Sequence, residues 1–191
     1  FFDDALVASK ELEITLTGKS CGLEERAPMC GIPYHAVEGY LSKLVSRGYK
    51  VAICEQVEDP KLAKGLVKRE VIRVVTPGTN LNVQSLEAGK NNYLLSIAYT
   101  PDGIGISAAD VTTGDYYVTE VEDLKKLNDE LMKYEPSEII CNEAFLVSGF
   151  DVNDLKSRLH ISVNALESHM FDDDGCRRIL MKHFKVNTLI G

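Results

Sequence analysis

The chain has 191 residues, of which 45% are hydrophobic and 26% are charged, and its 21 Lys and Arg against 29 Asp and Glu give a formal net charge of −8. A chain of this length forms one domain or two small ones, and this composition supports a buried core and excludes a mainly disordered state. No apolar run approaches the roughly 20 residues that cross a bilayer, and no signal peptide opens the sequence, so we expect a cytoplasmic protein. Because the first residue is Phe1 rather than Met, we expect part of a longer chain.

Missing motifs argue against two kinds of site. The five cysteines are odd in number and widely spaced, and none of them forms a Cys-x-x-Cys pair. Such spacing favours reduced thiols over a zinc or dithiol site. The sequence also has no Gly-x-x-x-x-Gly-Lys-Ser/Thr string, which excludes a P-loop nucleotide site.

Residues 1–80 predict a small mixed α/β unit. Asp3 and Asp4 are helix-capping residues, and apolar residues from Val37 to Val45 recur at the spacing of a helix that packs on a sheet. The predicted elements are a helix from Asp3 to about Glu11, an exposed loop over 18–28, a helix over 37–48, and strands over 50–56 and 69–76. The turn-forming residues 76–80 end this unit, and a linker is predicted over 81–91.

Residues 92–191 predict a sheet flanked by helices. Short turns join the first three predicted strands, which indicates an antiparallel meander, and a helix with Leu127 and Leu131 on one face follows them. The predicted strands cover 93–100, 104–111, 116–121, 138–141 and 160–163, and the predicted helices cover 124–134, 153–159 and 172–184. This order of elements is typical of the ribonuclease H class of folds.

Charge is distributed unevenly along the chain. Residues 1–80 hold 11 acids and 11 bases, so residues 81–191 hold the other 18 acids and 10 bases and therefore the whole net charge of −8. Five cations gather within thirteen residues of the first part: Lys61, Lys64, Lys68, Arg69 and Arg73. Such a cluster suits phosphate, which the acidic part repels, but a cluster of cations is more often an ordinary solvated face.

The string Asp110-Val-Thr-Thr-Gly-Asp115 has two interpretations. In a ribonuclease H-like fold, an acidic residue on the leading strands holds divalent metal ions, provided that other carboxylates such as Glu138 or Asp172 converge on it. The alternative is a turn in which Asp and Gly have their usual structural roles. Spacing alone does not choose between a metal site and a turn.

Three segments carry a resemblance to a known family. They are Met29-Cys-Gly-Ile-Pro-Tyr-His-Ala-Val37, Val51-Ala-Ile-Cys-Glu-Gln56 and Arg73-Val-Val-Thr-Pro-Gly-Thr79. The first eighty residues resemble the N-terminal region of the MutS family of DNA mismatch recognition proteins, and the rest is similar to the connector domain of that family, which has a ribonuclease H-like fold without nuclease activity. The resemblance implies an α/β (α+β) chain with a small mixed-sheet mismatch-recognition domain over 1–80, the linker over 81–91 and a connector domain over 92–191.

The resemblance implies binding to mismatched or looped double-stranded DNA from the minor groove. In the family, a Phe-x-Glu motif that probes the mispaired base lies a few residues before the stretch that resembles Phe1 to Ala5. We therefore expect weak, poorly discriminating DNA binding, and strand or core packing for Phe1 and Phe2. Supporting DNA contacts are predicted for Lys19, Met29, Pro33, Tyr34, His35, Lys68 and Arg69. Packing under the following helix is the alternative for Tyr34.

The resemblance also implies the partners of the parent protein. The ATPase of the family, with its ATP and Mg²⁺, and the regions that form its homodimer lie C-terminal to these two domains, and MutL-type matchmakers dock on the connector. The leading hypothesis is a DNA-binding and coupling module with no catalytic residue, metal or cofactor of its own and no membrane contact. The alternative is a metal-dependent ribonuclease H-like nuclease that uses Asp110.

Overall fold

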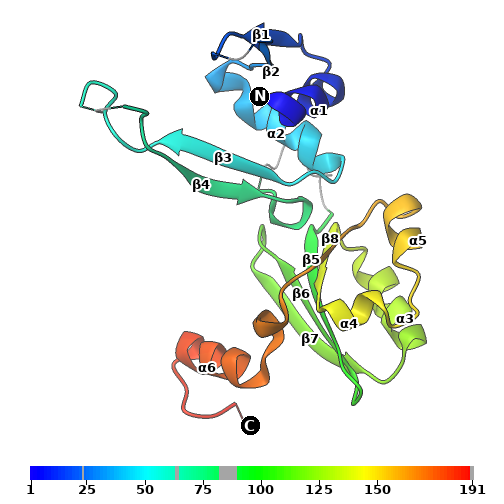
Figure 1. The fold of residues 1–191 in the computed structure, drawn as a ribbon. Coiled ribbons are helices and arrows are strands. Elements are labelled where there is room, and N and C mark those ends of the chain that lie inside the picture. The colour runs from blue at the N-terminus through cyan, green and yellow to red at the C-terminus, as the bar shows by residue number, and fades with distance from the viewer. Residues whose placement is uncertain (23, 63–64, 82–89, 190–191) are drawn as a thin grey trace. The chain divides into compact units, whose positions relative to one another are not determined.

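The computed structural model describes residues 1–22, 24–62, 65–81 and 90–189, and the chain divides into two compact units (Figure 1). Unit 1 runs from Phe1 to Lys90 and unit 2 from Asn91 to Gly191. Most of the linker predicted over 81–91 falls on 82–89, outside the described residues. Both units contain helices and strands, which confirms the predicted α+β class. No helix within the described ranges is long and apolar enough to cross a membrane.

Two helices form the centre of unit 1. They are α1 (Phe2–Leu12) and α2 (Val37–Ser46), and each buries one apolar face, as the spacing predicts. Among the described residues of unit 1, the buried apolar ones are Ala5, Leu12, Ala27, Leu41, Val45 and Val75. Near the ends of both helices, the Arg47 guanidinium donates to Glu11 Oε2 at 2.7 Å. This bond holds the pKa of Glu11 below its ordinary value.

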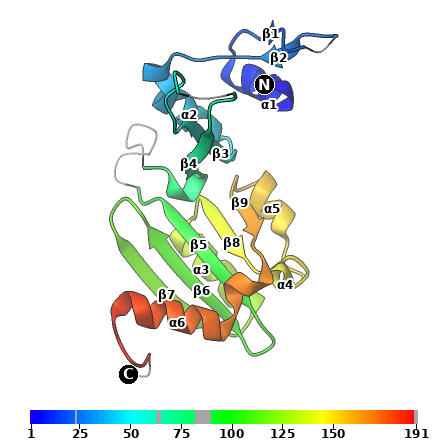
Figure 2. The same ribbon diagram turned by 60° about the vertical axis from the view of Figure 1, so that its left-hand side comes forward.

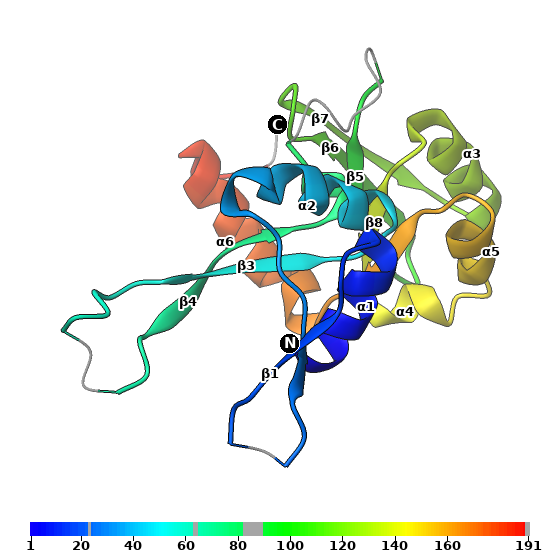
Figure 3. The same ribbon diagram turned by 90° about the horizontal axis from the view of Figure 1, so that it is seen from above.

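Two antiparallel strand pairs complete the described part of unit 1, where the resemblance implies a small mixed sheet. β1 (Thr17–Lys19) pairs with β2 (Ala27–Met29), and β3 (Val51–Gln56) pairs with β4 (Arg69–Val75). Each pair consists of strands that are consecutive in the chain, and such strands pair antiparallel because no crossover separates them. The exposed loop predicted over 18–28 is thus partly a hairpin. Figure 3 shows the β3–β4 pair extending away from the helices, whereas β2 packs against α1.

Unit 2 is built on a five-stranded sheet in the order β7-β6-β5-β8-β9. β5 (Tyr93–Tyr99), β6 (Ile104–Asp110) and β7 (Asp115–Val121) are antiparallel, as the short turns between them predict. β8 (Glu138–Cys141) pairs parallel with β5, and β9 (Ser162–Ala165) pairs parallel with β8. Helical crossovers precede both parallel strands, because a parallel partner requires a long return connection.

One face of this sheet carries the core of unit 2. Alternate residues of the strands, such as Leu95, Ile97 and Ile106, are fully buried against α3 (Leu124–Tyr134) and the short helices α4 (Glu143–Leu146) and α5 (Val152–Ser157). Helix α6 (Asp173–Phe184) lies on the other side of the sheet from α3 (Figure 2). The result matches the sheet flanked by helices that the sequence predicts for a ribonuclease H-like unit.

Several short elements differ from the prediction. Helix α4 has only four residues, too few to produce a periodic pattern. The last strand begins at Ser162 rather than at residue 160, because His160 has a φ of 55° and cannot continue an extended strand. Among the described residues, three 3₁₀ turns add to the predicted elements: η1 (Tyr34–Ala36), η2 (Pro77–Thr79) and η4 (Ser168–Phe171).

Candidate functional site

The β1–β2 hairpin carries two of the seven candidate DNA contacts. Lys19 ends β1 with an exposed side chain, and its ammonium lies 5.9 Å from the centre of the Phe1 ring. Met29 ends β2 and is partly buried, and its carbonyl accepts a hydrogen bond of 2.9 Å from the Thr17 hydroxyl. The hairpin therefore presents a cation at one end of the ladder and an apolar side chain at the other.

Three more candidates follow in the turn before α2. Pro33, Tyr34 and His35 are all exposed, and the Ala36 N–H donates to the Pro33 carbonyl at 3.0 Å to close the turn. The side chain of Tyr34 is 83% exposed, so the alternative in which it packs under the following helix is wrong. The extended backbone at Pro33 (φ −63°, ψ 137°) leads into η1 and directs Tyr34 away from the core. A large aromatic ring in solvent is available for stacking or groove contact.

Lys68 and Arg69 lie on the β3–β4 hairpin, at the end far from the buried Val75. Arg69 is exposed and stands opposite Gln56 in the ladder. The Lys68 ammonium lies 2.5 Å from Glu70 Oε1, and the Lys68 N–H donates to Glu58 Oε1 at 2.6 Å. An exposed pair of this kind is weak and open to exchange for a phosphate.

The other members of the predicted cation cluster are arranged differently. Arg73, also on β4, lies 3.5 Å from Glu38 Oε1 on α2 and is thus partly neutralised. Lys61 is exposed, and Lys64 lies outside the described residues. The seven candidates therefore form two groups, one on β1, β2 and the turn that follows, and one at the start of β4.

Sequence reasoning missed one cation and misjudged two phenylalanines. Arg26 precedes β2, and a Cβ added at Gly18 would lie 3.0 Å from the Arg26 Cβ, so the arginine covers the glycine beside Lys19. A prediction that residues 17–19 pair with residues 27–29 would have indicated that Arg26 lies close to Lys19. The predicted strand or core packing of Phe1 and Phe2 is wrong, because their side chains are 55% and 54% exposed. Both rings stand at the N-terminus of α1, and that of Phe1 lies close to Lys19.

Asp110 is held in a turn by short hydrogen bonds. Its Oδ2 accepts from the Asn92 N–H at 3.0 Å, and its Oδ1 accepts from the Thr112 N–H at 2.8 Å and the Thr112 hydroxyl at 2.6 Å. The carboxylate is buried, with a residue exposure of 1%. Burial acts to raise the pKa of Asp110, but the hydrogen bonds from Thr112 and Asn92 outweigh it and lower the pKa. A carboxylate saturated in this way has a structural role.

The two carboxylates suggested as partners for Asp110 are also engaged elsewhere. Glu138 Oε1 accepts from Asn164 Nδ2 at 3.0 Å, and Asp172 caps α6 by accepting from the Gly175 N–H at 2.8 Å. Within the described ranges, no group of three or more His, Cys, Asp or Glu side chains is placed to hold a metal ion. Of the two interpretations of the 110–115 string, the geometry supports the turn.

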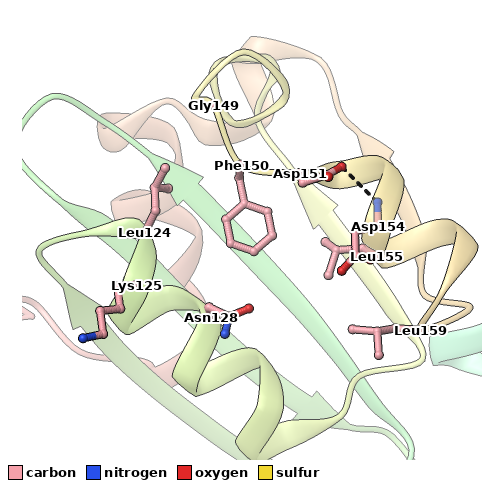
Figure 4. Close-up of a pocket in the computed structure, with 9 residues that line it drawn as sticks. All are labelled: Leu124, Lys125, Asn128, Gly149, Phe150, Asp151, Asp154, Leu155 and Leu159. Atoms are coloured by element: carbon pink, nitrogen blue, oxygen red, sulfur yellow. Dashed lines mark hydrogen bonds between the residues drawn. The ribbon is translucent and has the colours of Figure 1, made fainter.

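A pocket of about 330 Å³ lies in unit 2 between the start of α3 and the start of α5 (Figure 4). Its lining residues are Leu124, Lys125, Asn128, Gly149, Phe150, Asp151, Asp154, Leu155 and Leu159. Both carboxylates have structural partners: Asp151 accepts from the Asp154 N–H at 3.0 Å, and Asp154 pairs with Arg158 at 2.7 Å. The four large apolar side chains in this lining suit an apolar group better than a phosphate or a metal ion.

Comparison with known proteins finds matches along nearly the whole chain. Residues 1–84 match the family model of MutS domain I, and residues 92–191 match that of MutS domain II. A DNA mismatch repair protein MutS from Lachnoclostridium phytofermentans is 65% identical over 191 residues, which is 100% of this chain and 20% of that protein. Proteins of the same name from Ruminiclostridium cellulolyticum and Acetivibrio thermocellus are each 50% identical, over 99% and 97% of this chain and 22% of each relative. The chain thus spans about a fifth of the length of its curated relatives. With both family models matched in order and nearly every residue covered, this chain belongs to the MutS family of DNA mismatch repair proteins.

Proposed function

We propose that the chain is the part of a mismatch repair protein that contacts mismatched or looped duplex DNA and couples this contact to partner proteins. The observation that carries the proposal is the match of the chain to MutS domains I and II in succession. The distribution of charge supports it, since residues 1–80 have no net charge and residues 81–191 carry the whole −8. A phosphate backbone would meet less repulsion at unit 1 than at unit 2.

The contacts that we assign to unit 1 divide by chemistry. Lys19, Lys68 and Arg69 would neutralise phosphates and hold the register of the duplex, and Arg26 beside Lys19 joins this set. Met29, Pro33, Tyr34 and His35 would line the minor groove near the distorted step. A mispaired step unstacks at a lower cost than a paired one, so apolar and aromatic groups in the groove favour DNA that bends there.

The coupling role that we assign to unit 2 concerns protein partners. Its acidic surface suits a protein better than DNA, and a MutL-type matchmaker is the partner that we propose for it. ATP and Mg²⁺ would act in the remainder of a parent protein, which we propose to be a homodimer in the cytoplasm. The chain itself would need no cofactor and carry out no catalysis.

Replacing Tyr34 with Ala tests the assignment of the groove contact. We expect this change to weaken binding of the 191-residue chain to a mismatched duplex by about tenfold, since one aromatic stacking contact contributes about 1–3 kcal/mol. Binding to the matched duplex should change less. Fluorescence anisotropy with the two labelled duplexes measures both affinities.

Tyr116→Ala is the matched control, because Tyr116 is an exposed tyrosine in the acidic unit 2. It should leave both affinities unchanged. Equal effects of the two substitutions would contradict the groove contact, as would an unchanged affinity of the Tyr34 variant for the mismatched duplex.

The nuclease alternative predicts that the chain cleaves duplex DNA when Mg²⁺ is present, whereas the proposed module predicts no cleavage. Because Asp110 accepts three short hydrogen bonds from its own turn and from β5's entry, we expect a labelled duplex to stay intact when the chain and Mg²⁺ are added. Gel electrophoresis over a Mg²⁺ titration provides the measurement. Cleavage that disappears in the Asp110→Asn variant would establish the nuclease and refute the proposed module.

A further inference from the structure

β7 forms one edge of the sheet in unit 2, and within the described residues only β6 pairs with it. Its seven residues pair with β6 one to one, without a register shift. An edge strand leaves backbone N–H and C=O groups free to pair with another chain, and proteins usually block such an edge with Lys, Pro, a bulge or a very short strand. The sequence Asp115-Tyr-Tyr-Val-Thr-Glu-Val121 has none of these features.

The side chains of β7 make this edge well suited to receive another strand. Tyr116 and Val118 point to the same side of the strand and are 54% and 70% exposed. On the opposite side, the Tyr117 ring lies 6.4 Å from the ring of Tyr93 and 5.9 Å from that of Tyr134, measured between centroids. These ring contacts hold β7 in place, so a joining strand meets an edge that is already ordered.

Charge selects the kind of strand that fits. From Asp110 to Leu124 the chain has five acids and no Lys, Arg or His. Asp110 is buried and Glu122 pairs with Lys126 at 2.7 Å, while Glu120 is exposed on the edge itself. A second copy of this chain would bring the same acids to the edge and would be repelled. A segment rich in Lys or Arg would be attracted.

The other edge of the same sheet has neither feature. β9 has four residues rather than seven, so it offers fewer backbone hydrogen bonds. Residues 160–167 around it contain a single acid, Glu167, and one histidine, His160. β9 therefore serves as an internal reference for any effect at β7.

We propose that β7 is a docking site at which an extended, basic segment of a partner protein adds as a sixth strand. Main-chain hydrogen bonds to β7 would provide the affinity, and the neighbouring acids would select a partner strand with alternating cations. The proposal concerns unit 2 and stands whether or not unit 1 binds DNA.

Three synthetic peptides test this docking with the 191-residue chain. The probe is a capped peptide of four Lys-Val repeats, and the controls are four Glu-Val repeats and four Lys-Pro repeats. The Lys-Pro peptide has the same charge as the probe but lacks half of its backbone N–H donors. We expect only the Lys-Val peptide to bind, with an affinity that falls as salt rises, and to slow amide hydrogen exchange at 115–121 but not at 162–165.

Two substitutions distinguish the effect of a cation on the β7 edge from the effect of the change in net charge. Val118→Lys places a cation on the edge, and Val147→Lys adds the same charge at a residue that is 85% exposed outside the sheet. We expect Val118→Lys to weaken binding of the Lys-Val peptide at least tenfold and Val147→Lys to change it less than twofold. Tyr116→Lys repeats the test at a second position, should the first variant fold poorly.

Several results would overturn the proposal. Equal binding of the Lys-Pro and Lys-Val peptides would mean that charge alone attracts them. Slowed exchange at β9 instead of β7, or full affinity in both edge variants, would place the contact elsewhere. A dimer of the chain in sedimentation that Val118→Lys dissociates would identify a second copy as the occupant.

Discussion

Replacing Asp110 with Ala is expected to destabilise unit 2 by about 2–4 kcal/mol, because it removes the acceptor of the N–H groups of Thr112 and of the buried Asn92. The bond from Asn92 connects the entry of β5 with Asp110 at the end of β6, 18 residues along the chain, and the bond from Thr112 lies within the turn between β6 and β7. Urea unfolding followed by hydrogen exchange of the β5 and β6 amides measures this loss in unit 2 alone. Asp110→Asn should cost nearly as much, since its amide group presents donors toward other donors.

The contribution of Asp110 is also expected to depend on pH. The hydrogen bonds lower the pKa of Asp110 in the folded chain below that of the unfolded chain, where a free Asp has a pKa of about 3.9. A group of this kind stabilises the fold fully above its unfolded pKa, and the stabilisation is lost as pH falls through the folded pKa. The difference in unfolding free energy between the unchanged chain and the Asp110→Asn variant should therefore be constant near neutrality and shrink below about pH 4.

Asp102→Asn is the control for both experiments. Asp102 is exposed in the turn between β5 and β6, so the same chemical change there should alter stability by less than about 0.5 kcal/mol. If Asp110→Ala were as mild as Asp102→Asn, the turn would not depend on the Asp110 carboxylate. A stability difference that grew in acid would contradict the direction of the pKa shift.

The double variant Lys68→Ala/Arg69→Ala is expected to weaken DNA binding by about ten- to a hundredfold at low salt, for matched and mismatched duplex alike. Each phosphate contact releases counterions, so removing two should reduce the slope of log K against log salt by about 1.8. Because both side chains are exposed, the double variant should keep the fold of unit 1. Anisotropy titrations of the 191-residue chain at several salt concentrations provide the slope.

Lys125→Ala/Lys156→Ala removes the same charge from exposed positions in unit 2 and serves as the control. It should leave the salt slope unchanged. Should the Lys68 and Arg69 variant lose affinity only for mismatched duplex, these residues would contact bases instead of phosphates. An unchanged slope would remove both from the proposed interface.

The long elements of this chain were predictable because their own residues specify them. The stripe of Leu127 and Leu131 identifies α3, and the short turns at 101–103 and 113–115 predict the meander of β5, β6 and β7. Short elements were not predictable in this way. β1 and β2 have three residues each, and they exist because Thr17 and Met29 meet across the hairpin, which no local pattern reveals.

In the candidate site too, the sequence indicates the residue types and the structure decides where their side chains lie. The residue types for phosphate contact, Lys19, Lys68 and Arg69, are recognisable in the sequence, and the structure places them on exposed hairpin ends. The direction of Tyr34 was open until the backbone of the turn placed the ring in solvent. Arg26 was missed because its position beside Lys19 arises from strand pairing.

From its sequence alone, this protein had a defined family, a fold class and a charge division between its two parts, since motif identity, periodicity and composition are properties of local sequence. The tertiary structure decided the role of Asp110 and which strand lies at the edge of the sheet. A carboxylate ligates metal or closes a turn according to the donors that surround it, and here the Asn92 N–H arrives from a distant segment. Likewise, β7 is an edge because of the order of strands in the sheet, which depends on pairing between segments far apart in the chain.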